Sequence, residues 1–176
     1  MAMTLITTNT FSDASSSTFT SSIDSTYKLF LFKILNVHID TDATDFRIQF
    51  NVSGQTGYDE TMTTTWFDTR SDEAGSSPSL QYFGDLDKAQ ATTKQSLSYY
   101  NGNGADESVS GTVWLFNPSN TTYVTQWYAR TSQYRADDLI SDTFVEGYVN
   151  ATGAVVNVEF SPASGNFDGT IKMYGV

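Results

Sequence analysis

The sequence predicts an all-β protein, an antiparallel β-sandwich of jelly-roll type, with a concanavalin-like sandwich as the second choice. Three observations favour this class. About nine to eleven short runs of strand-forming residues are separated by turn residues, at the spacing typical of sandwiches and barrels. No stretch of useful length has the period of an amphipathic helix. Finally, 14% of the residues are aromatic and only 16% are charged, which suits sheets whose outer faces carry hydroxyl groups in place of ions.

The most apolar run, YKLFLFKILNVHI at residues 27–39, is predicted to be a central strand. Aromatic and branched residues dominate it, and turn-forming residues stand on both sides. One of its faces carries Leu29, Leu31, Leu35, Val37 and Ile39, and the other carries Phe30, Phe32 and Ile34. A strand that is apolar on both faces needs cover on both sides, from another segment of this chain or from another subunit. Phe30, Phe32 and Ile34 are therefore candidates for an oligomer interface.

The regions around this strand define the predicted domain organisation. Residues 1–17 are mostly Ser, Thr and Asn, and we expect them to form a flexible or extended N-terminal arm. Residues 18–176 are predicted to form a single β-sandwich domain that begins with a short strand at 18–23. After an acidic turn at 40–45, the strict alternation of residues 46–52 predicts a strand that forms a hairpin with the central strand.

The remaining strands follow from alternation between turn residues. They are predicted at residues 60–70, 80–82, 97–100, 108–116, 123–134, 143–149, 154–160 and 169–176. The runs 143–149 and 154–160 are expected to form a hairpin, since only a short turn separates them. In the second run the residues expected to face the core are Ala154, Val156, Val158 and Phe160. The polar segment before residue 97 has no clear period, and a short helical turn is expected around residues 87–93.

Charge and composition limit the partners of this chain. The formal net charge of −11 argues against nucleic acid, which requires a basic face, and against anionic membrane surfaces. The chain has no Cys, which excludes disulfides, thiolate nucleophiles and zinc–thiolate sites. The first residues lack the basic and apolar regions of a signal peptide, and no run approaches the ~20 apolar residues that span a bilayer. We therefore expect neither a nucleic acid nor a membrane as a partner.

The residue types do not favour catalysis. His38 is the single histidine and lies within the central strand, where a packed or edge position is far commoner than a catalytic base. No G-x-S-x-G motif is present to position a nucleophilic serine. The 20 Asp and Glu residues could include a glycosidase pair, but most flank turns, where capping and solubility explain them. We predict that the chain is not an enzyme.

Two weak binding signals remain. Asp40, Asp42 and Asp45 have the spacing of the start of a calcium loop, but the glycine and the closing glutamate of that loop are missing. We therefore predict no cofactor and keep calcium as the alternative. Among the aromatic residues, Tyr99 and Tyr100 precede an Asn-Gly turn, and one of two neighbours on a strand must point outward. These two tyrosines are the candidates for a ring that stacks on a glycan.

Six segments carry a resemblance to a known group of proteins. They are FTSSIDSTYK at residues 19–28, FKILN at 32–36, NVSGQTGY at 51–58, GTVWLFNP at 111–118, TYV at 122–124 and GTIKMYGV at 169–176. In these segments the chain resembles small virion structural proteins of tailed bacteriophages from marine and freshwater sources, including cyanophage-like ones. That group has no catalytic motif, so the resemblance transfers no active site.

The resemblance implies a role in the phage particle. It indicates a virion protein assembled in the host cytoplasm, and we expect a capsid decoration or cement protein that stabilises the head. Such a protein would be a homo-oligomer, most simply a trimer, with the major capsid protein among its partners. The alternative is a host-recognition module of a tail fibre or spike that binds surface glycan. A depolymerising enzyme is a third and weaker candidate.

Overall fold

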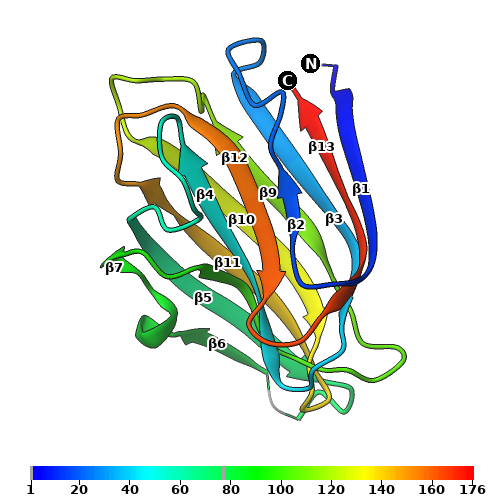
Figure 1. Ribbon diagram of the computed structural model, residues 1–176. Coiled ribbons are helices and arrows are strands. Elements are labelled where there is room, and N and C mark those ends of the chain that lie inside the picture. The colour runs from blue at the N-terminus through cyan, green and yellow to red at the C-terminus, as the bar shows by residue number, and fades with distance from the viewer. Residues whose placement is uncertain (1, 77) are drawn as a thin grey trace.

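The computed structural model describes residues 2–76 and 78–176, and it shows an antiparallel β-sandwich (Figure 1). A nine-stranded sheet, here the large sheet, packs on a four-stranded small sheet. The large sheet has the order β1 (Thr4–Ala14), β13 (Phe167–Gly175), β3 (Leu29–Ile39), β9 (Val109–Phe116), β10 (Thr125–Tyr134), β11 (Leu139–Val149), β5 (Met62–Asp72) and β6 (Ser79–Tyr82), with β7 (Ala89–Ala91) also beside β5. The small sheet has the order β2 (Ser17–Phe19), β12 (Val155–Pro162), β4 (Thr44–Val52) and β8 (Gln95–Asn101).

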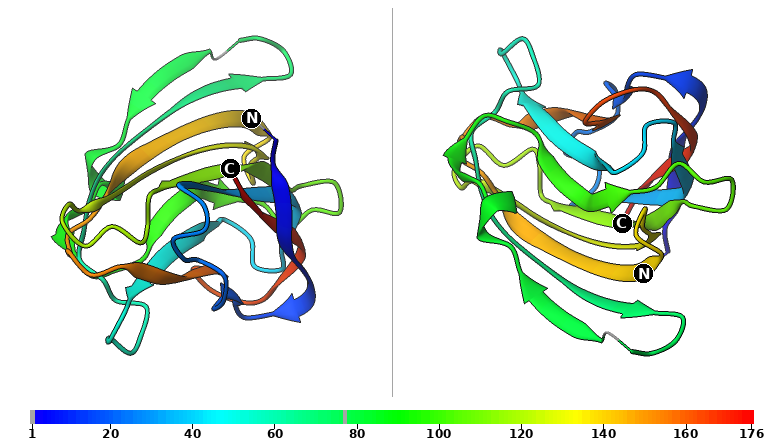
Figure 2. Two further views of the ribbon diagram at one scale, coloured as in Figure 1. Left: turned by 90° about the horizontal axis from the view of Figure 1, so that it is seen from above. Right: turned by 90° about the horizontal axis from the view of Figure 1, so that it is seen from below.

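The chain crosses repeatedly between the two sheets, as in a jelly roll. Successive strands β2, β3, β4 and β5 alternate between the small and the large sheet, and β11, β12 and β13 do the same. Seen from above and below, the sheets form two layers, and the β5–β6 end of the large sheet extends beyond the small one (Figure 2). The predicted fold class is confirmed. In the described part of the chain, no helix is long and apolar enough to cross a bilayer.

The core lies between the sheets and is rich in phenylalanine. Phe160 of β12 contacts Phe32 of β3, with ring centroids 5.7 Å apart, and stacks on Phe46 of β4 at 5.9 Å. Phe30 and Phe32 are fully buried, and Ile34 is 1% exposed. The prediction that Phe30, Phe32 and Ile34 form an oligomer interface is therefore wrong, because the small sheet of the same chain already covers them.

A bulge in β3 changes which residues share a face. The register with β9 shifts between Ile34 and Val37, and Asn36 has a φ of 48° in the left-handed region. The extra residue turns Val37 and Ile39 into the core beyond the bulge, while Leu29, Leu31 and Leu35 face outward. The predicted grouping of Leu29, Leu31, Leu35, Val37 and Ile39 on one face is thus correct only before Asn36.

Both predicted hairpins are wrong, because their strands lie in different sheets. The turn after β3 carries the chain across the core to β4, and the turn after β11 carries it to β12. Both crossings place apolar faces opposite one another in the core. In β12 a bulge lies between Val155 and Asn157, so the core residues are Val155, Val158 and Phe160 in place of the predicted alternation.

The predicted N-terminal arm is for the most part an edge strand. Strand β1 pairs with β13 from Thr4 to Ala14, and Phe11 packs on Phe167 with ring centroids 4.4 Å apart. Met1, the first residue of that predicted arm, lies outside the described residues. The expected helical turn also occurs earlier than predicted, as a 3-10 turn at Gly84–Leu86, since residues 89–91 form β7.

We expect Phe160→Ala to lower the free energy of unfolding by about 3–5 kcal/mol, because it leaves a cavity among buried rings. Leu80→Ala removes a side chain that is 71% exposed and should change stability by less than about 0.5 kcal/mol. Urea unfolding followed by far-UV circular dichroism measures both. Equal effects of the two substitutions would contradict this assignment of the core.

The end of β1 should detach in acid. The backbone N–H of Asp13 donates to Asp168 Oδ1 at 2.7 Å, and this bond, with a second from the Ser12 side chain, lowers the pKa of Asp168 from its ordinary 3.8. Because the folded pKa is the lower one, this stabilisation is present above the unfolded pKa and is lost as the pH falls through the folded pKa.

We expect the backbone amides of Ser12–Ala14 to lose their protection against hydrogen exchange as the pH falls below about 4. Protection here is the measured exchange rate corrected for the intrinsic rate at each pH. Asp168→Asn should show that loss already at pH 6. Asp24→Asn is the control, because the lowered pKa of Asp24 comes from Thr26 in a turn away from β1. Unchanged protection in Asp168→Asn would argue against this anchor.

Candidate functional site

The outward side of the large sheet, here the outer face, carries most of the exposed apolar groups. Ten large apolar or aromatic side chains are exposed in the described part of the chain, and eight of them lie on this face, since cross-strand partners share a side. The eight are Leu5, Leu35, Phe67, Leu80, Tyr82, Phe116, Tyr128 and Ile140. Scattered single apolar residues are ordinary on protein surfaces, but a concentration on one sheet face indicates a binding surface.

Five of the rings on the outer face form two groups, here the aromatic band. Trp114 stacks on Tyr128 with centroids 4.5 Å apart and an interplanar angle of 22°, and Phe116 lies 5.7 Å from Tyr128. Phe67 stacks on Phe144 at 5.0 Å and 6°. These contacts arise from register: β9 places Trp114 opposite Tyr128, and β5 places Phe67 opposite Phe144. Because the paired rings stack on each other, they offer a ligand their exposed edges and the ring faces that lie outside the stack.

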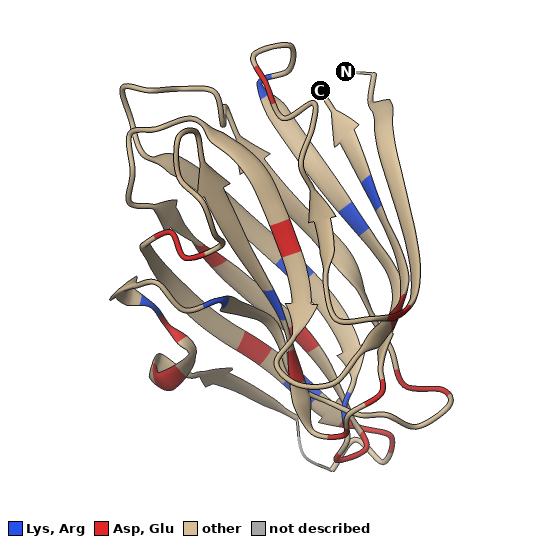
Figure 3. Ribbon diagram, viewed as in Figure 1, with Lys and Arg blue, Asp and Glu red and all other residues tan. Residues whose placement is uncertain are grey.

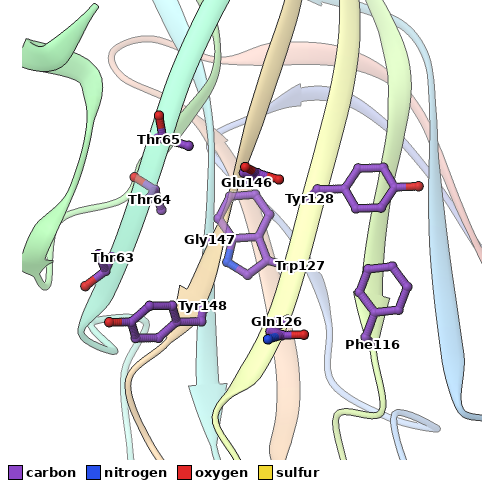
Figure 4. A pocket seen from close by; sticks show the side chains of 10 residues that line it. All are labelled: Thr63, Thr64, Thr65, Phe116, Gln126, Trp127, Tyr128, Glu146, Gly147 and Tyr148. Atoms are coloured by element: carbon purple, nitrogen blue, oxygen red, sulfur yellow. The ribbon is translucent and has the colours of Figure 1, made fainter.

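A depression of about 520 Å³ lies beside the aromatic band (Figure 4). Tyr128 and Phe116 stand on one side of it and Tyr148 on the other. Its floor lies at Gly147, where a Cβ would collide with the Thr63 carbonyl oxygen, so only glycine fits. Its polar groups come from Thr63, Thr65, Gln126 and Glu146. Hydroxyl, amide and carboxylate groups therefore stand next to ring surface, a combination typical of small-ligand sites.

Two further depressions lie on the outer face, and one of them continues the first. One, of about 610 Å³, shares Phe116 and Gln126 with it and reaches Tyr123 and Asn120 in the loop after β9. The other, of about 480 Å³, lies beyond Trp114 and is lined by Arg130 and Asp142 among others. The three depressions, here together called the trough, are lined by residues of β5, β9, β10 and β11.

Charge is unevenly distributed over the molecule. Acidic residues gather in the loops at the lower end of the sandwich, opposite the chain termini (Figure 3). On the outer face, Arg130 donates to both carboxylate oxygens of Asp142, its Nη2 lying 2.6 Å from Oδ2. These hydrogen bonds raise the pKa of Arg130. The Arg130 guanidinium also lies 4.9 Å from the Phe144 ring centroid, which fixes a polar group at the edge of the aromatic band.

The predicted glycan residues lie elsewhere. Tyr99 and Tyr100 are on β8 of the small sheet and are half-buried. The Tyr99 ring packs 6.0 Å from Phe83 and 6.4 Å from Trp66, and the Arg135 guanidinium lies 5.3 Å from the Tyr100 ring. Neither ring belongs to the aromatic band, so the structure does not favour them as a stacking platform.

The structure does not assemble the proposed calcium ligands. Asp40 Oδ1 accepts the N–H of Asn166 at 2.8 Å, and Asp45 Oδ2 accepts the hydroxyl of Ser96 at 2.6 Å. Asp42 is exposed in the turn between them. Residues 2–76 and 78–176 hold no group of three Asp, Glu, His or Cys side chains that could bind a metal ion. The three aspartates act individually, in part as hydrogen-bond acceptors for nearby segments.

The interior holds an ionic cluster that sequence reasoning missed. Asp68 is fully buried, and its Oδ2 accepts bonds from Arg70 Nε at 2.7 Å and from Ser141 Oγ at 2.8 Å. Arg135, 3% exposed, lies 4.0 Å from the same oxygen and binds Asp137, whose pKa it lowers. Alternation places Asp68 on the core side of β5, but nothing local in the sequence distinguishes it from a surface acid.

No family model matches this chain, and no significant match is found among curated proteins or solved structures.

We expect Asp68→Ala to lower the free energy of unfolding by about 3–5 kcal/mol, because it leaves buried guanidinium groups without their counter-charge. Asp142→Ala breaks the exposed pair with Arg130, whose side chain is 59% exposed, and should cost less than about 1 kcal/mol. Urea unfolding measures both. A small effect of Asp68→Ala would show that water can replace its carboxylate.

Proposed function

We propose that this chain is a non-catalytic recognition module of a bacteriophage particle that binds a surface glycan on the outer face of its large sheet. The observation that supports this most strongly is the Trp114, Phe116 and Tyr128 group of the aromatic band, whose rings line the trough together with hydroxyl, amide and carboxylate groups. The resemblance to small virion proteins supports its place on a phage particle, as the host-recognition alternative of a tail fibre or spike.

A glycan fits this chemistry better than a purely apolar ligand. A sugar ring offers C–H groups that pack on an aromatic face and hydroxyl groups that need hydrogen-bond partners. Trp114 and Tyr128 supply the first kind of contact, and Thr65, Gln126 and Glu146 supply the second. Because the trough crosses several strands, a chain of sugars can contact it at more than one position.

The non-catalytic part of the proposal rests on the side chains available. The single histidine, His38, lies on β3 beyond the bulge and does not line the trough, and its Nδ1 is hydrogen-bonded to the Glu107 carbonyl at 2.9 Å. Glu146 and Asp142 are the carboxylates that line the trough, and Asp142 is held by Arg130. A glycosidase needs two carboxyl groups that are free to act on the glycosidic bond, and here one of the two is engaged by Arg130.

The expected capsid decoration role and the expected trimer stay predictions. The three residues proposed to hold an oligomer together lie in the core, so a trimer would have to use a different surface. The outer face is the natural competitor for that use, since its apolar residues could contact a second copy. The test below separates the two uses of this surface.

We expect Trp114→Ala and Tyr128→Ala each to weaken binding to host-surface polysaccharide at least tenfold, which equals about 1.4 kcal/mol. Calorimetry on a polysaccharide that the wild-type protein retains on a glycan array measures this. Tyr100→Ala is the matched control, because it removes a half-buried ring from the small sheet and should leave affinity unchanged.

Two outcomes would overturn the proposal. In the first, Tyr100→Ala abolishes binding and Trp114→Ala does not, which would return the site to β8. In the second, no glycan binds, and sedimentation shows an oligomer that Trp114→Ala dissociates, which would make the outer face an interface between copies.

A further inference from the structure

Two lysines face each other on the outer face. Lys33 of β3 and Lys172 of β13 are directly paired in the antiparallel register, and Figure 3 shows basic positions side by side on these strands. Arg130 stands in the same row, since Thr112 of β9 is opposite both Lys33 and Arg130. Three of the nine basic residues of the chain therefore share one row of one sheet face, although the net charge of the chain is strongly negative.

No carboxylate of the described residues neutralises the lysine pair. The ion pairs of the described chain include neither Lys33 nor Lys172. Lys33 Nζ donates to the hydroxyl of Thr112 at 3.2 Å. Like charges directly opposite each other on neighbouring strands destabilise a sheet. Both strands are interior to the large sheet, so protection of a sheet edge, a common role of lysine, does not explain the pair.

The surroundings of the pair suit an oxyanion. Lys172 lines a depression of about 530 Å³ together with the threonines Thr8, Thr10 and Thr170. Thr8 of β1 is paired with Lys172, so its hydroxyl lies on the same face. The carboxylates on this face near the row are Asp142, held by Arg130, and Glu146, which belongs to the next row of the sheet. At the start of β13, Asp168 accepts a hydrogen bond from the N–H of Asp13.

The lysine pair is also next to the aromatic band. Trp114 is opposite Leu31 on β3, two residues along the strand from Lys33. Such diagonal neighbours on adjacent antiparallel strands are about 7–8 Å apart. A sugar unit stacked on Trp114 therefore places its substituents, or those of the next unit, within reach of the Lys33 ammonium.

We propose that Lys33 and Lys172, with the hydroxyls of Thr8 and Thr112, form an anion subsite, so that the ligand of the outer face is an acidic polysaccharide. The inference rests on the proposed function and adds the chemical class of its ligand. The groups recognised are carboxylates of uronic acids or sulfate esters, both of which present oxyanions to ammonium and hydroxyl donors.

The test compares three polysaccharides, a polyuronate, a sulfated galactan and a neutral galactan, by calorimetry at 50 and 300 mM salt. We expect the wild-type protein to bind at least one acidic polysaccharide at least tenfold more tightly than the neutral one, with weaker binding at high salt because salt screens exposed charges. The double variant Lys33→Gln, Lys172→Gln should lose this preference and most of the salt dependence. The relative response to polyuronate and sulfated galactan identifies which oxyanion is preferred.

Lys94→Gln is the control for loss of a lysine away from the outer face, because it removes one positive charge beside β8, where Lys94 is paired with Glu159. It should leave binding unchanged. Equal affinity of the wild-type and double-variant proteins for the acidic ligands would overturn the inference, and binding of the neutral galactan alone would do so while leaving the proposed function in place. Binding to vesicles that contain phosphatidylserine, without binding to any polysaccharide, would overturn both.

Discussion

The structure depends on one packing constraint, the burial of the phenylalanine-rich face of β3 against the small sheet. Phe32 and Phe160 meet across this interface, and Phe46 stacks on the second ring. Once that face is committed to the core, alternation sends Leu31, Lys33 and their cross-strand partners to the other side. Four strands cover only one side of a nine-stranded sheet, so the composition of the outer face follows from how the core is built.

Alternation predicted the strands well where the register is regular. The inward residues Phe46, Ile48 and Phe50 of β4 are all fully buried, as the sequence pattern indicates. The errors cluster at the bulges in β3 and β12, each of which inserts one residue and exchanges the two faces beyond it. A single Asn in a left-handed conformation leaves little trace in a sequence. The neighbours of each strand in its sheet could not be predicted for a different reason. Pairing between segments that are distant in the sequence depends on which apolar faces pack together, and the sequence of one strand does not contain that information.

In the candidate site, too, residues that are neighbours in the sequence could be recognised, whereas residues brought together by the sheet register could not. Tyr99 and Tyr100 attract notice because they are neighbours in the chain. Trp114 and Tyr128 come from separate runs, and only the β9–β10 register makes them a stacked pair. The pairing of Lys33 with Lys172 joins strands from the two ends of the chain. Each of these residues was assigned to a strand, but none could be assigned to a common surface without the sheet order.

The pairing of the first strand with the last has a consequence for how this sandwich can be joined to other polypeptides. Thr4 lies opposite Gly175, so both ends leave the molecule at the same pole (Figure 1). A short bridge would close them, which makes the fold suited to circular permutation and to insertion into a surface loop of a carrier protein. In either arrangement the acidic loops would lie at the end of the sandwich opposite the carrier protein, and the outer face, which carries Trp114, would stay exposed.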